Sequence, residues 1–301
     1  MCTGALCTGG LLPLTRRLSG RYARRCRSSP TSTKRGLPSL TAVDPEFPIF
    51  VLCVVVFDRD EYVGQVVPAV YELKMDIWEH EGLILHSRDI RRAQGDFIFL
   101  RDRTQRQPFY ERLNAVIRAA PMQVLAVAVR KDAHLALHGG RARDPYDLAL
   151  RFAFERVALL LEDAGETAVR VVAEARTPQQ DDLLRLSLQR LLRRGTSTMP
   201  AQRFARLFFE LTFLPKMAGV VGTQLADLMA YPIARYVVAP ARANRAFTVV
   251  EPKLCRRNGT RIGLAIYPPT EGLDSEVPES RTAPQVQGPF ADRELPSLLS
   301  N

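Results

Sequence analysis

The pattern of apolar and polar positions along the chain predicts strands that alternate with helices. Residues 47–58 (FPIFVLCVVVFD) form a continuous apolar run, as expected for a strand buried on both faces. Shorter runs of the same kind at residues 122–130 and 168–174 predict two more strands. Apolar residues three and four positions apart predict helices at residues 61–80, 109–119, 146–163, 181–194 and 222–238. Strands that alternate with helices predict an α/β fold.

Weaker patterns complete the expected organisation. Residues 84–86 predict a short strand or turn, residues 204–213 a strand or mixed segment, and residues 246–250 a last strand. Together these elements predict a single α/β domain over residues 41–267. From residue 268 onward, six prolines occur in 34 residues among acidic and small polar ones, which predicts a disordered tail over residues 268–301.

The net charge of +10 is unevenly distributed along the chain. Residues 1–43 hold eight basic residues and no acidic one, whereas the other 258 residues hold 34 basic and 32 acidic ones. The nearly neutral body disfavours broad electrostatic binding to DNA, although nucleic acid remains a candidate partner. The longest apolar run has eleven residues, well short of the roughly 20 that span a membrane, so no membrane association is expected. Nothing in the sequence indicates an oligomeric state.

Cysteine usage indicates a reducing compartment. Three of the five cysteines precede residue 40, and the body has only Cys53 and Cys255, in apolar or strand-like settings. No pair has CxxC spacing, which argues against a zinc site. We therefore expect a cytoplasmic protein.

Residues 1–40 differ from the body and leave several interpretations open. The segment is rich in arginine and serine and poor in acidic residues, as a mitochondrial transit peptide would be. A secretory signal fits badly, because the arginines follow the short apolar stretch instead of preceding it. The composition is also compatible with an abnormal translation start.

Carboxylates are the best candidates for chemistry. The chain has no P-loop, GxGxxG, GxSxG or HExxH motif, which removes the corresponding activities as favoured hypotheses. Glu174 ends a predicted strand, and Gln224 and Asp227 share one face of a predicted helix. Carboxylates that converge from such positions would bind Mg²⁺ or Mn²⁺ and support phosphodiester cleavage.

Structural explanations of the same residues stay open. Asp227 can be a solvated or salt-bridged helix residue, and Glu174 can pair with a neighbouring arginine. In the sequence His-Ser-Arg-Asp, His86 and Asp89 can be ligands, or they can mark a strand end followed by a helix cap at Ser87.

Residues 222–235 (GTQLADLMAYPIAR) resemble the C-terminal signature of an uncharacterised, mainly bacterial family known as domain of unknown function 3800. That signature runs Gly-x-Gln-hydrophobic-Ala-Asp-Leu. Residues 47–58, 86–89 and 171–176 are also similar, so the resemblance covers roughly residues 40–267. It implies a ribonuclease H-like fold with a mixed sheet flanked by helices, and a metal-dependent nuclease or phosphodiesterase activity.

The resemblance also suggests roles for particular residues. The catalytic residues would be Glu174 and Asp227. The ligands of Mg²⁺ or Mn²⁺ would be Glu174, Asp227 and Asp89. The residues in contact with substrate would be Gln224, His86 and Lys253, although Gln224 can instead support the metal ligands from behind. One alternative is a non-catalytic module of the same fold that binds nucleic acid or protein, and another is a defective product.

The sequence departs from the family at its start. Members begin with a strand that carries Asp-Glu-Ser/Ala-Gly, but here no such motif precedes Phe47, and residues 30–36 read Pro-Thr-Ser-Thr-Lys-Arg-Gly. If the third bases of the codons for these residues are chosen suitably, the adjacent reading frame encodes Tyr-Val-Asp-Glu-Ala-Gly. We therefore favour a shifted frame up to about residues 36–40 over a transit peptide. This hypothesis makes the first strand doubtful and predicts that the chain as written is inactive or poorly folded.

Overall fold

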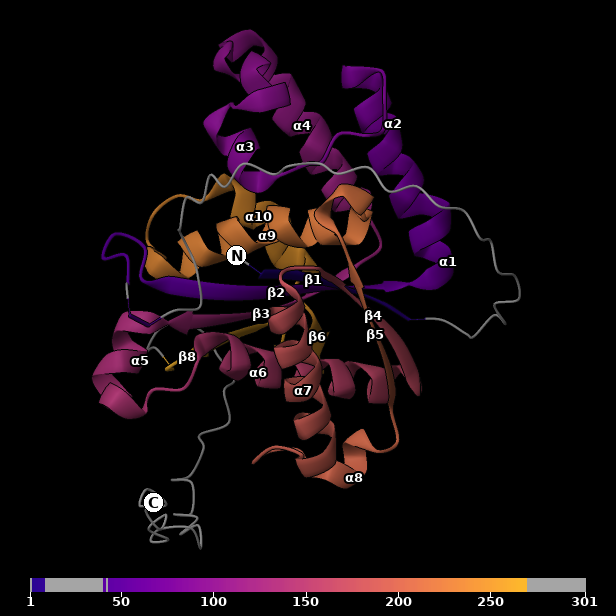
Figure 1. Ribbon diagram of the computed structural model, residues 1–301. Helices are drawn as coiled ribbons and strands as arrows, with labels where there is room; N and C mark the ends of the chain where they lie inside the picture. Colours follow the sequence, from indigo (N-terminus) through magenta and orange to yellow (C-terminus); the bar gives the residue numbers. More distant parts are fainter. Residues whose placement is uncertain (1, 9–39, 42, 270–301) are drawn as a thin grey trace, which may run out of the picture.

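The computed structural model describes residues 2–8, 40–41 and 43–269, which form a mixed β-sheet between two layers of helices (Figure 1). The strands lie in the order β5-β4-β1-β2-β3-β8. Their bounds are β1 (Cys2–Thr8), β2 (Ile49–Asp58), β3 (Gln123–Arg130), β4 (Ala168–Glu174), β5 (Phe208–Leu214) and β8 (Leu264–Tyr267). Strands β1 and β2 are parallel to each other and antiparallel to the other four. Strands β6 (Arg256–Arg257) and β7 (Thr260–Arg261) form a separate short hairpin.

Helices cover both faces of the sheet. The upper layer in Figure 1 contains α2 (Val67–Trp78), α3 (Ser87–Arg92), α4 (Arg103–Ala119), α9 (Val221–Val238) and α10 (Arg245–Val250). The lower layer contains α5 (Lys131–His138), α6 (Pro145–Ala164), α7 (Pro178–Arg194) and α8 (Ala201–Phe204). Shorter helical turns are α1 (Arg59–Glu61), η1 (Tyr62–Val66), η2 (Gly95–Arg101), η3 (Gly139–Arg141), η4 (Lys216–Ala218) and η5 (Glu251–Lys253). Across the described ranges, every helix is too short or too polar to cross a bilayer.

Strand β2 joins the two halves of the core. Its residues from Ile49 to Phe57 are all buried, as the continuous apolar run predicts. Because side chains alternate along a strand, Cys53 and the other odd-numbered residues pack in the cluster that contains α9. Leu52 and the other even-numbered residues pack in the cluster that contains α6 and α7. Helices on both faces therefore explain why no polar alternation occurs here.

Strand β1 occupies the centre of the sheet, between β2 and β4. Its register pairs Gly4 with Val54 on one side and Ala173 on the other. A first strand is thus present at Cys2–Thr8, where the frame-shift hypothesis made it doubtful. The hypotheses of a shifted frame and of a disordered tail concern mainly residues 9–39 and 270–301. These residues lie outside the described ones.

The prediction of a strand at residues 246–250 is wrong. Residues 246–250 belong to helix α10 and not to a strand, because the Asn244 side chain accepts a hydrogen bond from Phe247 N (3.1 Å) and so caps the helix. The last strand is β8, which pairs with β3. Residues 204–213 divide between α8 and β5, and residues 84–86 are extended without pairing as a strand.

Candidate functional site

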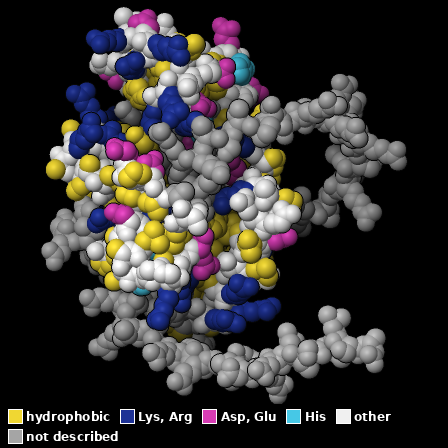
Figure 2. Space-filling view, turned by 60° about the vertical axis from the view of Figure 1, so that its left-hand side comes forward, with side chains coloured by type: hydrophobic (Ala, Val, Ile, Leu, Met, Phe, Trp, Pro, Cys, Tyr) yellow, Lys and Arg dark blue, Asp and Glu magenta, His cyan; other side chains and the backbone are white. Residues whose placement is uncertain are grey.

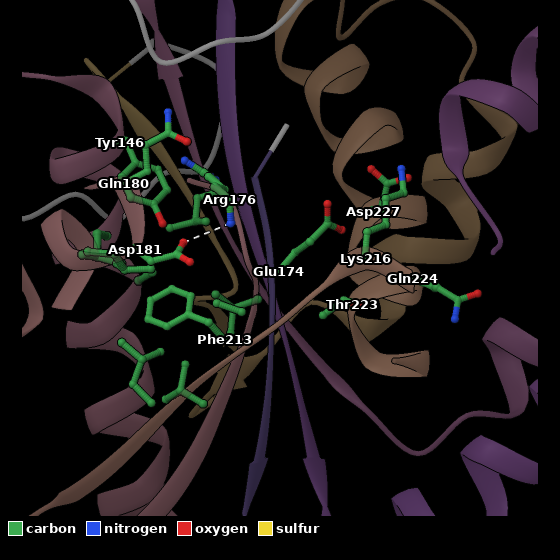
Figure 3. A pocket seen from close by; sticks show the side chains of 18 of the residues that line it. Tyr146, Glu174, Arg176, Gln180, Asp181, Phe213, Lys216, Thr223, Gln224 and Asp227 are labelled. Carbon is green, nitrogen blue, oxygen red and sulfur yellow. Dashed lines mark hydrogen bonds between the residues drawn. The ribbon is translucent and has the colours of Figure 1, made fainter. Parts of the chain in front are cut away.

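A pocket of about 130 Å³ opens at the edge of the sheet where β4 and β5 end and β1 and β2 begin (Figure 3). Leucine, valine and phenylalanine side chains of β2, α6, α7 and β5 form its apolar wall. The polar residues that line it are His86, Tyr146, Glu174, Arg176, Gln180, Asp181, Lys216, Thr223, Gln224 and Asp227. The pocket thus combines both signs of charge with an apolar wall, as ligand sites commonly do.

Helix α9 contributes its first turns to the pocket. Its apolar side, including Leu225 and Met229, is fully buried against the sheet. The spacing that buries these residues leaves Gln224 and Asp227, three positions apart, together at the margin of the core. The sequence prediction that the two side chains share one face is therefore consistent with the structure.

Gln224 supports the chain segment that lies beside it. Its Oε1 accepts a hydrogen bond from Leu85 N (2.9 Å), and its Nε2 donates one to Gly219 O (2.6 Å). Only 4% of the residue is exposed. Both ends of the amide are already bonded to backbone, so Gln224 has a supporting position in the pocket wall and does not have its amide free to contact substrate.

Asp227 is a partly buried carboxylate with one engaged oxygen. Its Oδ2 accepts a hydrogen bond from Ser87 N (2.7 Å) and lies 3.9 Å from His86 Nε2. Burial lowers the pKa of the nearby Arg91, and the proximity of Tyr231 and Asp227 counteracts that shift. Asp227 lines the pocket, and its Oδ1 makes no hydrogen bond to a described residue.

Glu174 ends β4 on the face of the sheet that α9 covers, because Val169 and Val171 point to the opposite face. The neighbouring arginines have other contacts: Arg170 pairs with Glu210, and the Arg176 guanidinium lies 4.7 Å from the Tyr146 ring centre. In the part of the chain that the structure describes, the Glu174 carboxylate has neither an ion pair nor a hydrogen bond. Figure 3 shows it between Arg176 and Asp227.

His86 and Asp89 lie at the start of α3. Helix α3 begins at Ser87, and His86 is its N-cap residue, so the predicted cap is displaced by one position. His86 lines the pocket, and its Nδ1 lies 2.9 Å from Asp89 Oδ2. Asp89 is not among the described lining residues, so it reaches the pocket only through His86 and not as the separate metal ligand that the sequence suggested.

Lys253 lies away from the pocket. Its Nζ donates hydrogen bonds to the carbonyl oxygens of Arg118 and Ala120 (2.7 Å each) at the end of α4, and burial lowers its pKa. It therefore stabilises a helix C-terminus and does not contact ligands of the pocket. The cations that do line the pocket, Arg176 and Lys216, follow the ends of β4 and β5, a position that could have identified them.

The side chains of the pocket can hold a metal ion only if water and substrate supply the remaining ligands. Within residues 2–8, 40–41 and 43–269, no three His, Cys, Asp or Glu side chains are grouped closely enough to hold an ion. Glu174 and Asp227 nevertheless both line the pocket and have oxygens without a partner among these residues. Mg²⁺ commonly binds through one or two carboxylates, with water and substrate phosphate completing its shell. The residues present match that arrangement and not a closed protein site.

Comparison with known proteins finds no matching family model, curated protein or solved structure. The fold and the pocket define an α/β protein with a mixed sheet, whose pocket at one sheet edge gathers acidic and basic side chains from distant segments.

Proposed function

We propose that this chain is a hydrolase of phosphodiester bonds with a ribonuclease H-like fold, related to the family known as domain of unknown function 3800. One observation carries the proposal. Four residues selected from the sequence come from three separate segments and line one pocket: His86, Glu174, Gln224 and Asp227. Two cationic side chains, Arg176 and Lys216, line the same pocket, and such groups bind phosphate oxygens.

In this proposal Glu174 and Asp227 hold Mg²⁺ or Mn²⁺ together with water and substrate. The ion would supply a Lewis acid that polarises phosphate and lowers the pKa of bound water. Arg176 and Lys216 orient the phosphate, and the apolar wall limits the access of bulk water. Cys53 and Cys255 are free and buried, which supports a reducing compartment such as the cytoplasm.

A second candidate function is binding without cleavage. It is favoured by the hydrogen bonds of Gln224 and Asp227, because they explain the most specific part of the family signature as support for residues 85–87. On the face shown in Figure 2, Lys and Arg side chains form separate groups with acidic side chains between them. That distribution favours recognition at the pocket over a broad basic surface. The frame-shift hypothesis predicts the opposite of cleavage, namely that the chain as written is inactive, and the assay below decides between that hypothesis and the proposed function.

The test is cleavage by the full chain of end-labelled single-stranded RNA, single-stranded DNA and a chromogenic phosphodiester, with Mg²⁺, with Mn²⁺ and with chelator. We expect metal-dependent cleavage that falls about 100-fold or more in Glu174→Gln and Asp227→Asn. An exposed carboxylate outside the pocket, Asp182, provides the matched control as Asp182→Asn.

Cleavage that is equal in Glu174→Gln and in the control would refute this assignment of the site. Binding of nucleic acid without cleavage under any metal condition would favour the second candidate. Asp227→Asn keeps an oxygen that can accept from Ser87 N, so loss of activity in that variant would report on charge and not on the position of α3.

A further inference from the structure

Two side chains of α9 fix the position of the segment that carries His86. Gln224 accepts a hydrogen bond from Leu85 N, and Asp227 accepts one from Ser87 N. Residues two apart in an extended segment direct their N–H groups the same way, and residues three apart on a helix lie on one face. The two side chains therefore bind this segment much as a neighbouring strand would. His86, between the two bonded amides, is consequently held at the pocket wall.

The contact with Asp89 defines which nitrogen of His86 can act as an acceptor. An ionised carboxylate only accepts hydrogen bonds, so the 2.9 Å contact between Asp89 Oδ2 and His86 Nδ1 requires a proton on Nδ1. In the neutral ring, Nε2 then carries the lone pair. Nε2 lies 3.9 Å from Asp227 Oδ2, which is too long for a hydrogen bond and leaves its lone pair for another partner.

From this geometry we infer that His86 is the proton-transfer residue of the pocket and that Asp89 is its positioning residue. The inference rests on the proposed function and adds a general base to it. The sequence suggested that His86 is a ligand, a substrate contact or the end of a strand, and assigned it no proton transfer. A carboxylate that fixes the tautomer of a histidine, whose other nitrogen faces the reacting group, is the arrangement that general-base catalysis requires.

The step balances with water as the only co-reactant. His86 Nε2 takes a proton from a water molecule, and the electron pair of that O–H bond stays on oxygen. The oxygen forms a new bond to phosphorus, while the bond from phosphorus to the leaving oxygen breaks and its electron pair goes to that oxygen. The leaving oxygen takes a proton from a solvent water on its own side of phosphorus, and the imidazolium releases its Nε2 proton to solvent, which restores neutral His86.

A general base is inactive when it is protonated, so the pH–rate profile of the reaction should have an acid limb. Several charged groups around the ring shape that acid limb. They are Asp89 and Arg91 on α3, Asp227 on α9, Glu174 at the end of β4, and Arg176 and Lys216 at the pocket.

The first experiment does not depend on activity. In full-length protein with ¹⁵N-labelled histidine, long-range ¹H–¹⁵N spectra report the tautomer of each of the four rings, and His86→Gln identifies the signals of His86. We expect the Nδ1–H tautomer for His86 in the parent chain and a shift towards Nε2–H in Asp89→Ala. Asp182→Ala, which removes an exposed carboxylate of α7, should leave the spectrum of His86 unchanged.

The second experiment uses the phosphodiester assay across pH 5–9. We expect His86→Gln to lower kcat about 100-fold or more and to remove the acid limb of the profile. Asp89→Ala should lower kcat by about tenfold with little change in KM and should alter the same limb. A merely structural role of Asp89 would change neither the tautomer nor the shape of the profile.

The outcomes separate this inference from the proposed function. If the parent chain cleaves phosphodiesters but His86→Gln keeps its rate and acid limb, or the ring is the Nε2–H tautomer, the inference is overturned and the function stands. If the parent chain cleaves no phosphodiester, both are overturned, whatever the spectra show. Cleavage that requires His86, together with the expected tautomer, supports both.

Discussion

Replacement of Gln224 by leucine should destabilise the protein far more than the same replacement at another glutamine of the pocket. The substitution keeps a similar volume but removes both hydrogen bonds of the amide, to Leu85 N and to Gly219 O. Leu85 is 1% exposed, so water cannot replace the lost partner of its N–H group. Gly219 is half-buried, and its carbonyl can reach solvent after a small shift.

The expected loss follows from these two orphaned groups. A buried group without a partner costs about 1–3 kcal/mol. With the Leu85 amide near the upper end and the Gly219 carbonyl near the lower end, the free energy of unfolding should fall by about 2–4 kcal/mol. That is a large part of a typical total of about 5–15 kcal/mol. With a urea slope of about 3 kcal/mol per molar, the midpoint should shift by about 1 M.

Urea unfolding followed by circular dichroism measures this shift. Gln180→Leu is the matched control, because Gln180 lines the same pocket, is exposed, and has no side-chain hydrogen bond within the described residues. Its stability should change by less than about 0.5 kcal/mol. Equal midpoints for the two variants would refute the argument that Gln224 holds the pocket wall.

Gln224→Glu tests the donor half of the amide alone. The new carboxylate can still accept from Leu85 N, but it places an unprotonated oxygen against Gly219 O. The destabilisation should therefore be largest at high pH. It should lessen as the pH falls through the pKa of the new carboxyl, because the protonated group can donate again.

Three further predictions concern regions outside the pocket. Burial raises the pKa of the Cys53 and Cys255 thiols, that of Cys255 to about 11. Peptide mapping should therefore find both cysteines unalkylated by iodoacetamide at pH 8 until the protein unfolds. Rapid alkylation of the native chain would contradict their burial. Lys253→Met should lower the free energy of unfolding by about 1–2 kcal/mol, because two hydrogen bonds at the end of α4 are lost. Since Lys253 lies away from the pocket, calorimetry should show an unchanged affinity for ligands of the pocket. The hydrogen bond from Arg203 lowers the pKa of Glu162, so this partly exposed pair should stabilise the fold by about 0.2–1 kcal/mol above the ordinary glutamate pKa. That contribution is lost as pH falls through the lowered value, so the difference in urea stability between Arg203→Met and the parent chain should be smaller at pH 3 than at pH 7.

Local patterns determined the elements that bury a regular apolar surface. Strand β4 has the predicted bounds, and β2, β3, α6 and α9 begin and end within a few residues of those expected. These segments are long enough for period or continuity to indicate their structure without knowledge of their neighbours. The same patterns placed Glu174 at a strand end and Asp227 at the edge of a buried helix face, which is why both were found from sequence.

Tertiary structure decided the elements whose local signals are weak or ambiguous. Strand β1 (CTGALCT) has no clear alternation, and pairing with β2 and β4 defines it. The apolar run in α10 suits a helix as well as a strand, and the cap at Asn244 selects the helix. Intrinsic propensity is too small to resolve such short segments, so long-range pairing and end effects determine their form.

The site shows the same division. Spacing on one helix put Gln224 beside Asp227, but no pattern indicated that these residues bind amides 139 and 140 positions away. The sequence pattern also did not place Arg176 and Lys216 at the pocket or exclude Lys253 from it. The sequence by itself determined which side chains share a strand or helix face, because that depends only on backbone geometry. Only the tertiary structure decided which faces meet at the pocket, because that depends on how β2, β4 and α9 are arranged around one core.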